Sequence, residues 1–288
     1  MHWTYKRDWL ILGVPDNTTA QEAQDRPMRA PIYQVDAFAD GRFTGNPAAV
    51  VVLGSFLADA TLQAVAAENN LAETAFLVPD GDGYRIRWFT PTVEVALCGH
   101  ATLASSAVVM ERLEPGRTSV VFQSRSGALP VERDGDDYVM DFPARSCEPV
   151  DRPGGLAAAL GAQPVQVHAN TANYLAVLGS AAEVRQLRPD IASIARLGRE
   201  GVIVTAEGEA PFDFTSRYFA PAKGIPEDPV TGGAHCMLAP FWASRLGKTA
   251  FRARQASQRG GDVRCAVVGN RVTLAGSCAF YLQGEIEI

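Results

Sequence analysis

The segment RWFTPTVEVALCGHA, residues 87–101, decides the fold because a related segment, RYFAPAKGIPEDPVTGGA, recurs at residues 217–234. RWFTP aligns with RYFAP at an offset of 130 residues (87 to 217), and CGHA aligns with TGGA at an offset of 133 (98 to 231). The second copy therefore carries a three-residue insertion, which contains Glu227 and Asp228. Internal repetition on this scale predicts two similar halves.

Each copy leads into an apolar stretch, HATLASSAVVMERL at 100–113 and GGAHCMLAPFWASRLG at 232–247. Both are opened by glycine and are apolar almost all round, which predicts helices buried on most sides, with a bend at Pro240 in the second. Related by a pseudo-two-fold axis, the two helices would direct free N–H groups and positive dipole ends at one point. That arrangement favours a bound carboxylate or other anion.

Short β-like runs dominate the chain from Ile32 onward, most of them bounded by Gly, Pro, Asp or Ser. They include AAVVVL, TAFLVP, YRIRWFT, SVVFQS, YVMDFP, GVIVTA, DFTSRYF and RVTLAG. Two further helices with mixed faces are expected at 59–70 and 180–198. The pattern predicts an α+β protein.

The composition argues against several classes of function. The chain has 288 residues, 47% of them apolar, and a net charge of −6 with scattered Lys and Arg, which disfavours a nucleic-acid partner. Five cysteines without a C-x-x-C pair argue against a disulfide framework and a zinc ribbon, and fit a reducing cytoplasm. No stretch approaches the ~20 apolar residues of a membrane span.

The first 29 residues are expected to be an appendage. WLILGV at 9–14 is shorter than the apolar core of a signal peptide, and PDNTTAQEAQDRPMR at 15–29 is polar without periodicity. Met28 is therefore a candidate for the true start.

Five segments together resemble the PhzF family of phenazine biosynthesis, which is related to the diaminopimelate epimerase fold. They are FTGNPAAVVVL, NLAETAFL, RWFTPTVEVALCGHATLASSAVV, SRYFAPAKGIPEDPVTGGAHCMLAPFW and QASQRGGDVR. The resemblance covers nearly all of residues 32–288. It implies two pseudo-symmetric domains, each a barrel-like sheet around a central helix, at 30–145 and 146–278, with a C-terminal strand at 279–288 returning to the first.

The resemblance also implies a function. Family members carry out cofactor-independent isomerisation by proton transfer on a small carboxylate-bearing metabolite, in a cleft between the domains, without metal, and they are homodimers. We expect the same of this chain.

Glu73, in NNLAETAFLVP at 69–79, falls on the family's catalytic carboxylate, the general acid/base. From the residues alone, a helix cap or an arginine partner would be the better interpretation. Burial beside Leu71 and Phe76 would disfavour its charged form, which would let it both accept and donate a proton near neutrality.

Gly99 and His100 fall on the family's GH element, whose N–H groups bind the substrate carboxylate and whose imidazole hydrogen-bonds to it. His100 could instead only cap the helix. Asp228 falls on the second acidic residue, which orients the substrate's polar substituent, and its alternative role is a turn before Pro229.

Gly232 and Gly233 match the second helix N-terminus, where small residues let the backbone approach a ligand, although they could form a simple turn. Asn46 is expected to fix a turn near the cleft, with ligand contact as the alternative. Ala72 and Gly233 stand where the family often has serine. With two hydroxyl donors missing, the pocket either uses backbone N–H groups alone or takes a ligand other than the dihydro-hydroxyanthranilate of phenazine producers.

Three alternatives stay open. A racemase would use paired thiols, but the repeat places Thr231 opposite Cys98, and Cys236 lies more than a turn into the helix. A metal site from Cys98, His100, His235 and Cys236 lacks a recognised ligand spacing. A ligand-binding or interaction protein without useful turnover is the third, against which the intact acidic residues and His100 argue.

Overall fold

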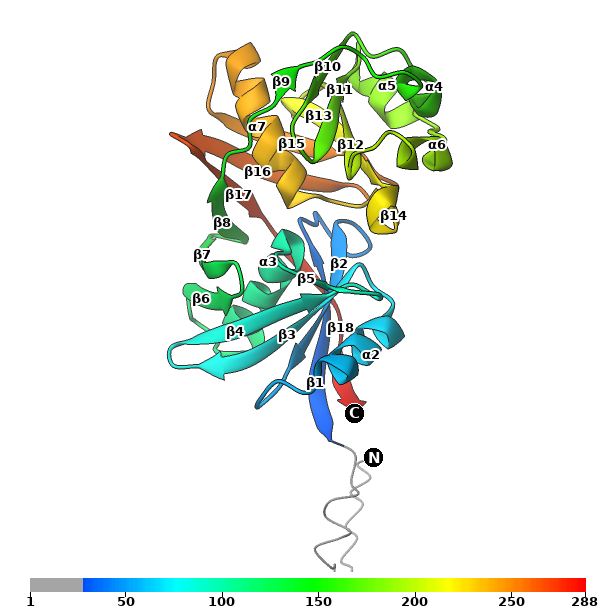
Figure 1. Ribbon diagram of the computed structural model, residues 1–288. Coiled ribbons are helices and arrows are strands. Elements are labelled where there is room, and N and C mark those ends of the chain that lie inside the picture. Colours follow the sequence, from blue (N-terminus) through cyan, green and yellow to red (C-terminus); the bar gives the residue numbers. More distant parts are fainter. Residues whose placement is uncertain (1–27) are drawn as a thin grey trace, which may run out of the picture.

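Two lobes make up the part of the chain that the computed structural model describes, residues 28–288 (Figure 1). The first lobe contains the strands β1 Arg29–Ala37, β2 Asn46–Val52, β3 Glu73–Asp80, β4 Gly83–Phe89, β5 Glu94–Val95, β6 Ser119–Ser124, β7 Gly127–Asp134, β8 Asp137–Pro143 and β18 Cys278–Glu287. Its helices are α2 Asp59–Asn69 and α3 Gly99–Val108, and α3 continues as a π-helical turn, η1 Val109–Leu113.

The second lobe lies above the first in Figure 1. Its strands are β9 Glu148–Pro149, β10 Gln166–Ala169, β11 Asn173–Val177, β12 Gly201–Glu207, β13 Phe214–Ala220, β14 Ile225–Asp228, β15 Ala250–Gln255, β16 Gly261–Val268 and β17 Arg271–Gly276. Its helices are α4 Leu156–Leu160, α5 Ala181–Gln186, α6 Ile191–Ala195, the 3₁₀ turn η2 Pro221–Lys223 and α7 Gly232–Leu246.

The strands of both lobes pair in the same sequence. In the first, β1–β2 is antiparallel, β2–β3 parallel, β3–β4 antiparallel, β4–β6 parallel, and β6–β7 and β7–β8 antiparallel. In the second, β10–β11, β11–β12, β12–β13, β13–β15, β15–β16 and β16–β17 repeat that series of orientations. The predicted pseudo-symmetry of the fold is therefore confirmed.

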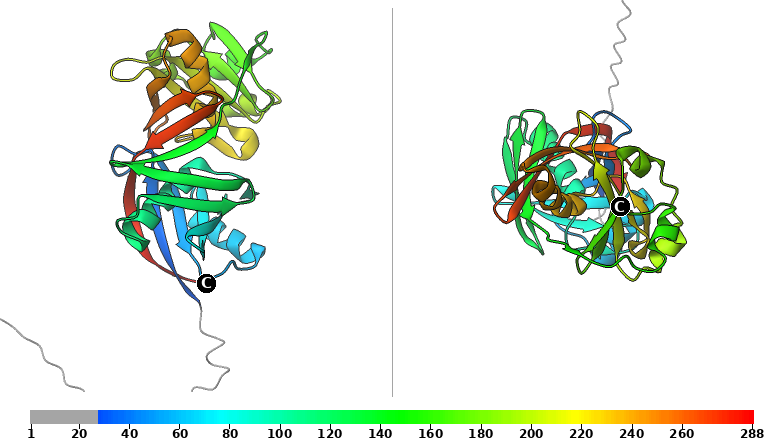
Figure 2. Two further views of the ribbon diagram at one scale, coloured as in Figure 1. Left: turned by 90° about the vertical axis from the view of Figure 1, so that its left-hand side faces the viewer. Right: turned by 90° about the horizontal axis from the view of Figure 1, so that it is seen from above.

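One strand ladder and one crossing of the chain connect the lobes. β8 pairs antiparallel with β17, from Tyr138 opposite Gly276 to Pro143 opposite Arg271. The chain then returns to the first lobe, where β18 pairs antiparallel with β1 and ends beside the start of that strand (Figures 1 and 2).

The predicted end of the N-terminal appendage, at residue 29, needs a correction. Met28 exchanges two backbone hydrogen bonds with Ile288, at 3.0 and 2.8 Å, and Arg29 begins β1, so both belong to the ladder with β18. Sequence periodicity missed them because only Ile32 onward shows a run of strand-forming residues. Residues 1–27, the rest of the expected appendage, lie outside the described residues.

The helix expected at 180–198 is also different, because it is split into α5 and α6. Pro189 lacks an amide hydrogen and disfavours helical geometry at Arg188, which ends the first piece. Ser180 and Asp190 cap the two pieces, each accepting a hydrogen bond from a backbone N–H three residues on.

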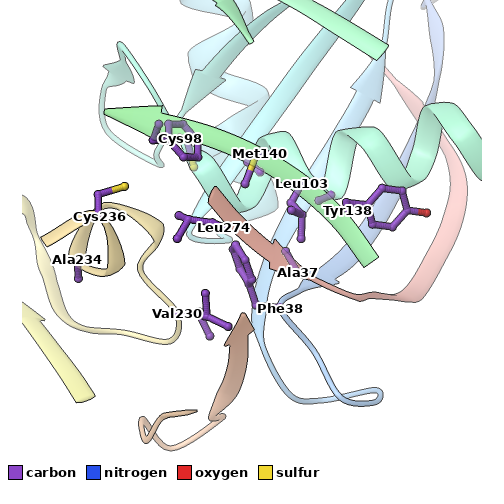
Figure 3. Packing of buried hydrophobic residues seen from close by; sticks show 14 of the residues in the cluster. Ala37, Phe38, Cys98, Leu103, Tyr138, Met140, Val230, Ala234, Cys236 and Leu274 are labelled. Carbon is purple, nitrogen blue, oxygen red and sulfur yellow. The ribbon is translucent and has the colours of Figure 1, made fainter. Parts of the chain in front are cut away.

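The two long helices are buried as predicted. Every residue of α3 after Gly99 is buried, and one apolar cluster continues from α3 into α7 through Phe38, Met140 and Leu274 (Figure 3). The lobes pack closely, since a Cβ at Gly276 would lie 2.5 Å from the ring of Phe38. No helix within residues 28–288 has the length and apolar character needed to cross a membrane.

Arg259, in the loop between β15 and β16, reaches from the second lobe into the first. Its Nη2 donates to Asp36 Oδ1 at 2.8 Å, and its Nε donates to the carbonyl oxygen of Gly45 at 2.9 Å. Asp36 is only 2% exposed; burial raises its pKa, and the charge of Arg259 offsets part of that rise. This ion pair holds the β1–β2 loop, which leads into Asn46, against the second lobe.

Replacing Arg259 with alanine leaves the Asp36 carboxylate buried without its cation, which typically costs about 3–5 kcal/mol. The Arg259 side chain is itself 32% exposed, so we expect the lower end of that range in the free energy of unfolding by urea at pH 7. Arg271→Ala is the matched control, since the Arg271–Asp141 pair is 45% and 41% exposed and should contribute only about 0–1 kcal/mol. Equal losses would contradict the role given to Arg259.

Candidate active site

A cavity of about 330 Å³ opens between the lobes. The N-termini of both buried helices line it, Gly99 and His100 from α3 and Gly232 and Gly233 from α7. Cys98 and Thr231, the residues before the two helices, cap neither of them with a side-chain hydrogen bond. Backbone N–H groups of both first turns therefore remain free to bind a ligand.

Glu73 begins β3 and is held beside β2, where Ala48 is its ladder partner. Its side chain lines the cavity and approaches His100, with Glu73 Oε2 3.1 Å from His100 Nε2. The two atoms form no directed hydrogen bond, and neither has another partner within residues 28–288 although both are buried. Buried polar atoms that line a cavity and have no hydrogen-bond partner can bind a ligand.

The other ring nitrogen of His100, Nδ1, lies 3.3 Å from Asn46 Nδ2 and 3.5 Å from Cys98 Sγ. Asn46 uses both of its amide hydrogens elsewhere, on Asp228 and on the carbonyl oxygen of Val230. An N–H at His100 Nδ1 can therefore donate only to the sulfur of Cys98.

Burial alone would lower the pKa of His100, but the neighbouring Cys98 and Glu73 side chains hold it well above its ordinary value. Burial raises the pKa of the Cys98 thiol, and the charge of Glu73 adds to that rise. Because the thiol is then neutral near pH 7, Glu73 is the charge that favours the imidazolium form of His100.

Asn46 connects the lobes at this point. It is fully buried at the start of β2, and its Nδ2 donates to Asp228 Oδ1 at 2.7 Å. Thr231 donates from its hydroxyl to Asp228 Oδ2 at 2.6 Å. Gln255, also fully buried, accepts from the N–H of Thr231 at 2.9 Å and donates to the carbonyl oxygen of Asp228 at 2.8 Å. This network fixes the direction of the Asp228 carboxyl group.

Burial raises the pKa of Asp228 from 3.8 to about 6. The positive charge of His100 and the hydrogen bonds from Thr231 and Asn46 oppose this shift, while the charge of Glu73 adds to it. Asp228 is therefore ionised at pH 7, close to the pH at which it takes up a proton.

The sequence did not single out three other cavity residues, which are Arg145 after β8 and Asn173 and Tyr218 of the second lobe. Tyr218 donates from its hydroxyl to Asn173 Oδ1 at 2.9 Å, and burial raises the pKa of Tyr218, so it stays a neutral donor. The repeat could have pointed to Tyr218, because the second copy has this polar aromatic residue where the first copy has Trp88. Arg145 follows β8 outside any motif and had no such signal.

Two predicted substrate-binding residues lie elsewhere. Ala72, in the bend before β3, is half-buried and does not line the cavity. Asn46 lies behind the cavity wall and acts there through Asp228. The structure brings the other predicted residues together around the cavity, which are Glu73, Gly99, His100, Asp228, Gly232 and Gly233.

The family model described as phenazine biosynthesis-like protein matches residues 35–284. A Pseudomonas aeruginosa protein described as an uncharacterized isomerase is 49% identical over 261 residues, which cover 91% of this chain and all of the relative. The crystal structure of a PhzF family protein from Enterococcus faecalis superposes with a TM-score of 0.88 at 42% identity, covering 91% of this chain and all of that one. The chain belongs to the phenazine biosynthesis-like (PhzF) family.

As a member of the PhzF family, the chain is an isomerase with the two-domain epimerase-like fold. A hydroxyproline epimerase from Agrobacterium vitis, solved with bound trans-4-hydroxy-L-proline, superposes with a TM-score of 0.57 over 90% of this chain and 93% of that one. At 12% identity, that similarity extends only to the fold.

The position of Cys236, more than a turn into its helix, suggested an argument against paired thiols in this PhzF protein, and that argument was wrong. Cys236 lines the same cavity as Cys98, because a residue four positions after Gly232 lies on the same side of the helix. Burial raises the pKa of Cys236 to about 11, so its thiol is neutral at pH 7.

The donor atoms that could hold a metal are not those expected. Glu73, Cys98 and His100 each offer one atom, all within 4.8 Å of one another. His235 does not join them, because its Nδ1 lies 2.9 Å from the carbonyl oxygen of Thr231 inside α7. A thiol with a raised pKa would have to lose its proton before it could bind a metal.

The shifted pKa of Asp228 makes stability depend on pH. Between pH 3.8 and about 6 the folded state binds more protons at Asp228 than the unfolded state, so this residue lowers stability progressively as the pH rises through that window. Asp228→Asn cannot titrate. We therefore expect the urea midpoint of the variant, relative to the natural protein, to increase from pH 4 to pH 6 and then level off. A flat or opposite trend would contradict the shift.

Proposed function

We propose that this PhzF protein is a cofactor-independent isomerase that moves a proton on a small carboxylate-bearing metabolite. The observation that carries the proposal is the pair of buried atoms Glu73 Oε2 and His100 Nε2, which lie 3.1 Å apart at the wall of the cavity between the lobes and make no directed hydrogen bond. General acid/base catalysis requires a proton-transferring group within hydrogen-bond reach of the proton that it moves.

In this mechanism the substrate carboxylate binds at the free N–H groups of Gly99, Gly232 and Gly233, where both helix dipoles favour negative charge. Glu73 removes a proton from carbon and returns it at another carbon. Protonated His100 stabilises the negative charge that develops in between. Asp228, held by Asn46 and Thr231, accepts a hydrogen bond from the hydroxyl or amino substituent and keeps the substrate in register.

A racemase or epimerase is the second candidate, and the observation in its favour is that Cys98 and Cys236 line one cavity from opposite lobes. The raised pKa values of both thiols weigh against it, since a thiol base must be ionised. A ligand-binding protein with little turnover is the third candidate. We further propose a cytoplasmic homodimer, as the family resemblance implies, and the free thiols fit a reducing compartment.

Glu73→Gln tests the general base. The amide is nearly isosteric but cannot take the proton, so we expect turnover to fall by roughly 10²–10⁴-fold or more. Once a substrate is found, its isomerisation and the incorporation of deuterium at carbon in D₂O measure the loss. Glu207→Gln, at an exposed carboxylate, is the matched control and should behave as the natural protein does.

Full turnover in Glu73→Gln together with loss in Cys98→Ala would replace this mechanism with the thiol mechanism. Tight ligand binding without any conversion by the natural protein would favour the binding protein. Missing deuterium counts against the mechanism only when isomerised product is also missing, because a shielded carboxyl group can return the same proton.

Asp228→Asn should weaken substrate binding and kcat together by moderate factors, because the amide keeps the size of the side chain but changes its hydrogen bonds. Glu73→Gln should lower kcat with substrate affinity largely kept. Steady-state kinetics of the two variants on the same substrate separate these roles. Complete loss of turnover in both would indicate a two-carboxylate mechanism.

A further inference from the structure

Arg145 presents an unpaired positive charge to the active-site cavity. It follows β8 where the chain passes between the lobes, and its backbone N–H donates to the carbonyl oxygen of Cys236 at 2.9 Å. Within residues 28–288 its guanidinium group has no hydrogen bond or ion pair. Lys223, another cation at the cavity, is already paired with Glu200 at 2.7 Å. The donors of Arg145 are therefore free for a ligand.

The guanidinium group of Arg145 lies over the first turn of α7. A Cβ built on Gly233 would be 3.5 Å from Arg145 Nη1, so that nitrogen is just beyond the volume that a side chain at 233 would fill. A serine at 233 would place its hydroxyl in or beside that space. Gly233 thus leaves room for the guanidinium group next to the free N–H groups of the α7 N-terminus.

Other groups show that the same cavity is built for a ligand. His100 Nε2 is buried, has no hydrogen-bond partner within the described chain, and lines the cavity from the opposite lobe. The uncapped first turn of α3 adds backbone donors beside it. These donors and the charge of Arg145 surround one space, in which an anionic group would be satisfied from both lobes.

We propose that Arg145 is a specificity-determining residue that binds the substrate carboxylate beside the N-terminus of α7, taking over the role of the absent hydroxyl at position 233. This inference rests on the proposed function. A planar guanidinium group binds a carboxylate through two parallel hydrogen bonds, whereas a hydroxyl donates one. The enzyme therefore selects small carboxylic acids over their neutral amides and esters by charge.

A neighbouring cavity of about 280 Å³ offers the other possible place for an anion. Arg145 lines it too, together with Arg245 and His168. Arg245 is therefore the matched control, because it is an arginine of that second cavity and does not line the first.

The first experiment measures binding by thermal shift at pH 7.5 for small carboxylates and their matched amides, with anthranilate and anthranilamide as one pair. The natural protein should prefer the carboxylates. Arg145→Gln should weaken their binding by about tenfold to a hundredfold, as expected for charge-assisted hydrogen bonds, and leave amide binding unchanged. Arg145→Lys should retain part of the affinity, and Arg245→Gln should retain all of it.

The second experiment tests the exchange of roles between positions 145 and 233. Gly233→Ser alone should change carboxylate binding little, because Arg145 already supplies the donors there and the new Cβ would lie at an ordinary contact distance of 3.5 Å from its Nη1. In the Arg145→Gln background the same serine should restore part of the binding, since its hydroxyl then supplies a donor that is missing. The two effects should therefore be strongly non-additive.

Three results would overturn the inference. The first is that the natural protein binds no carboxylate more tightly than the matching amide. The second is an equal loss of carboxylate binding in Arg145→Gln and Arg245→Gln. The third is that the effects of the changes at 145 and 233 on binding are additive. Failure of the proposed function would look different. Carboxylate selectivity would then still depend on Arg145, while no bound acid would be isomerised.

Discussion

The burial of two helices that are apolar on almost every face is the constraint on which the rest of the structure depends. Such a helix has no side that can face water, so a sheet must curl around each one. The two lobes do this with the same series of strand pairings, and the apolar cluster between them joins α3 to α7. Because both helices begin at this junction, their free N–H groups meet there, at the cavity between the lobes.

Two polar contacts across the junction reach buried groups that bear on the site. Arg259 compensates the charge of Asp36, and Asn46, one residue after the loop that Arg259 holds, donates to Asp228 in the other lobe. The relative position of the lobes therefore determines where Asp228 points. Buried charges interact more strongly than charges at the surface, so a small displacement of either lobe would change the interaction between His100 and Asp228.

The charges around the cavity are balanced by groups from both halves. Glu73 and Asp228 supply negative charge from different lobes, and the raised pKa of His100 and the free guanidinium group of Arg145 supply positive charge. The residues that line the cavity do not follow the pseudo-symmetry of the fold. Cys98 is matched by Thr231 and His100 by Gly233, so one lobe contributes Glu73 and His100, the other contributes Asp228, and Arg145 comes from the segment between them.

The sequence by itself determined the two-fold organisation, the two buried helices and the family, because repeated segments and all-round apolar stretches are local patterns that burial imposes. It also named Glu73, His100 and Asp228, because contiguous motifs that contain them resemble those of the PhzF family. Only the tertiary structure decided that Asn46 acts behind the cavity wall, that Ala72 lies away from it and that Cys236 lies on it. It likewise revealed Arg145, which no motif marks. These facts depend on contacts between residues distant in the chain, and such contacts leave no periodic trace in the sequence.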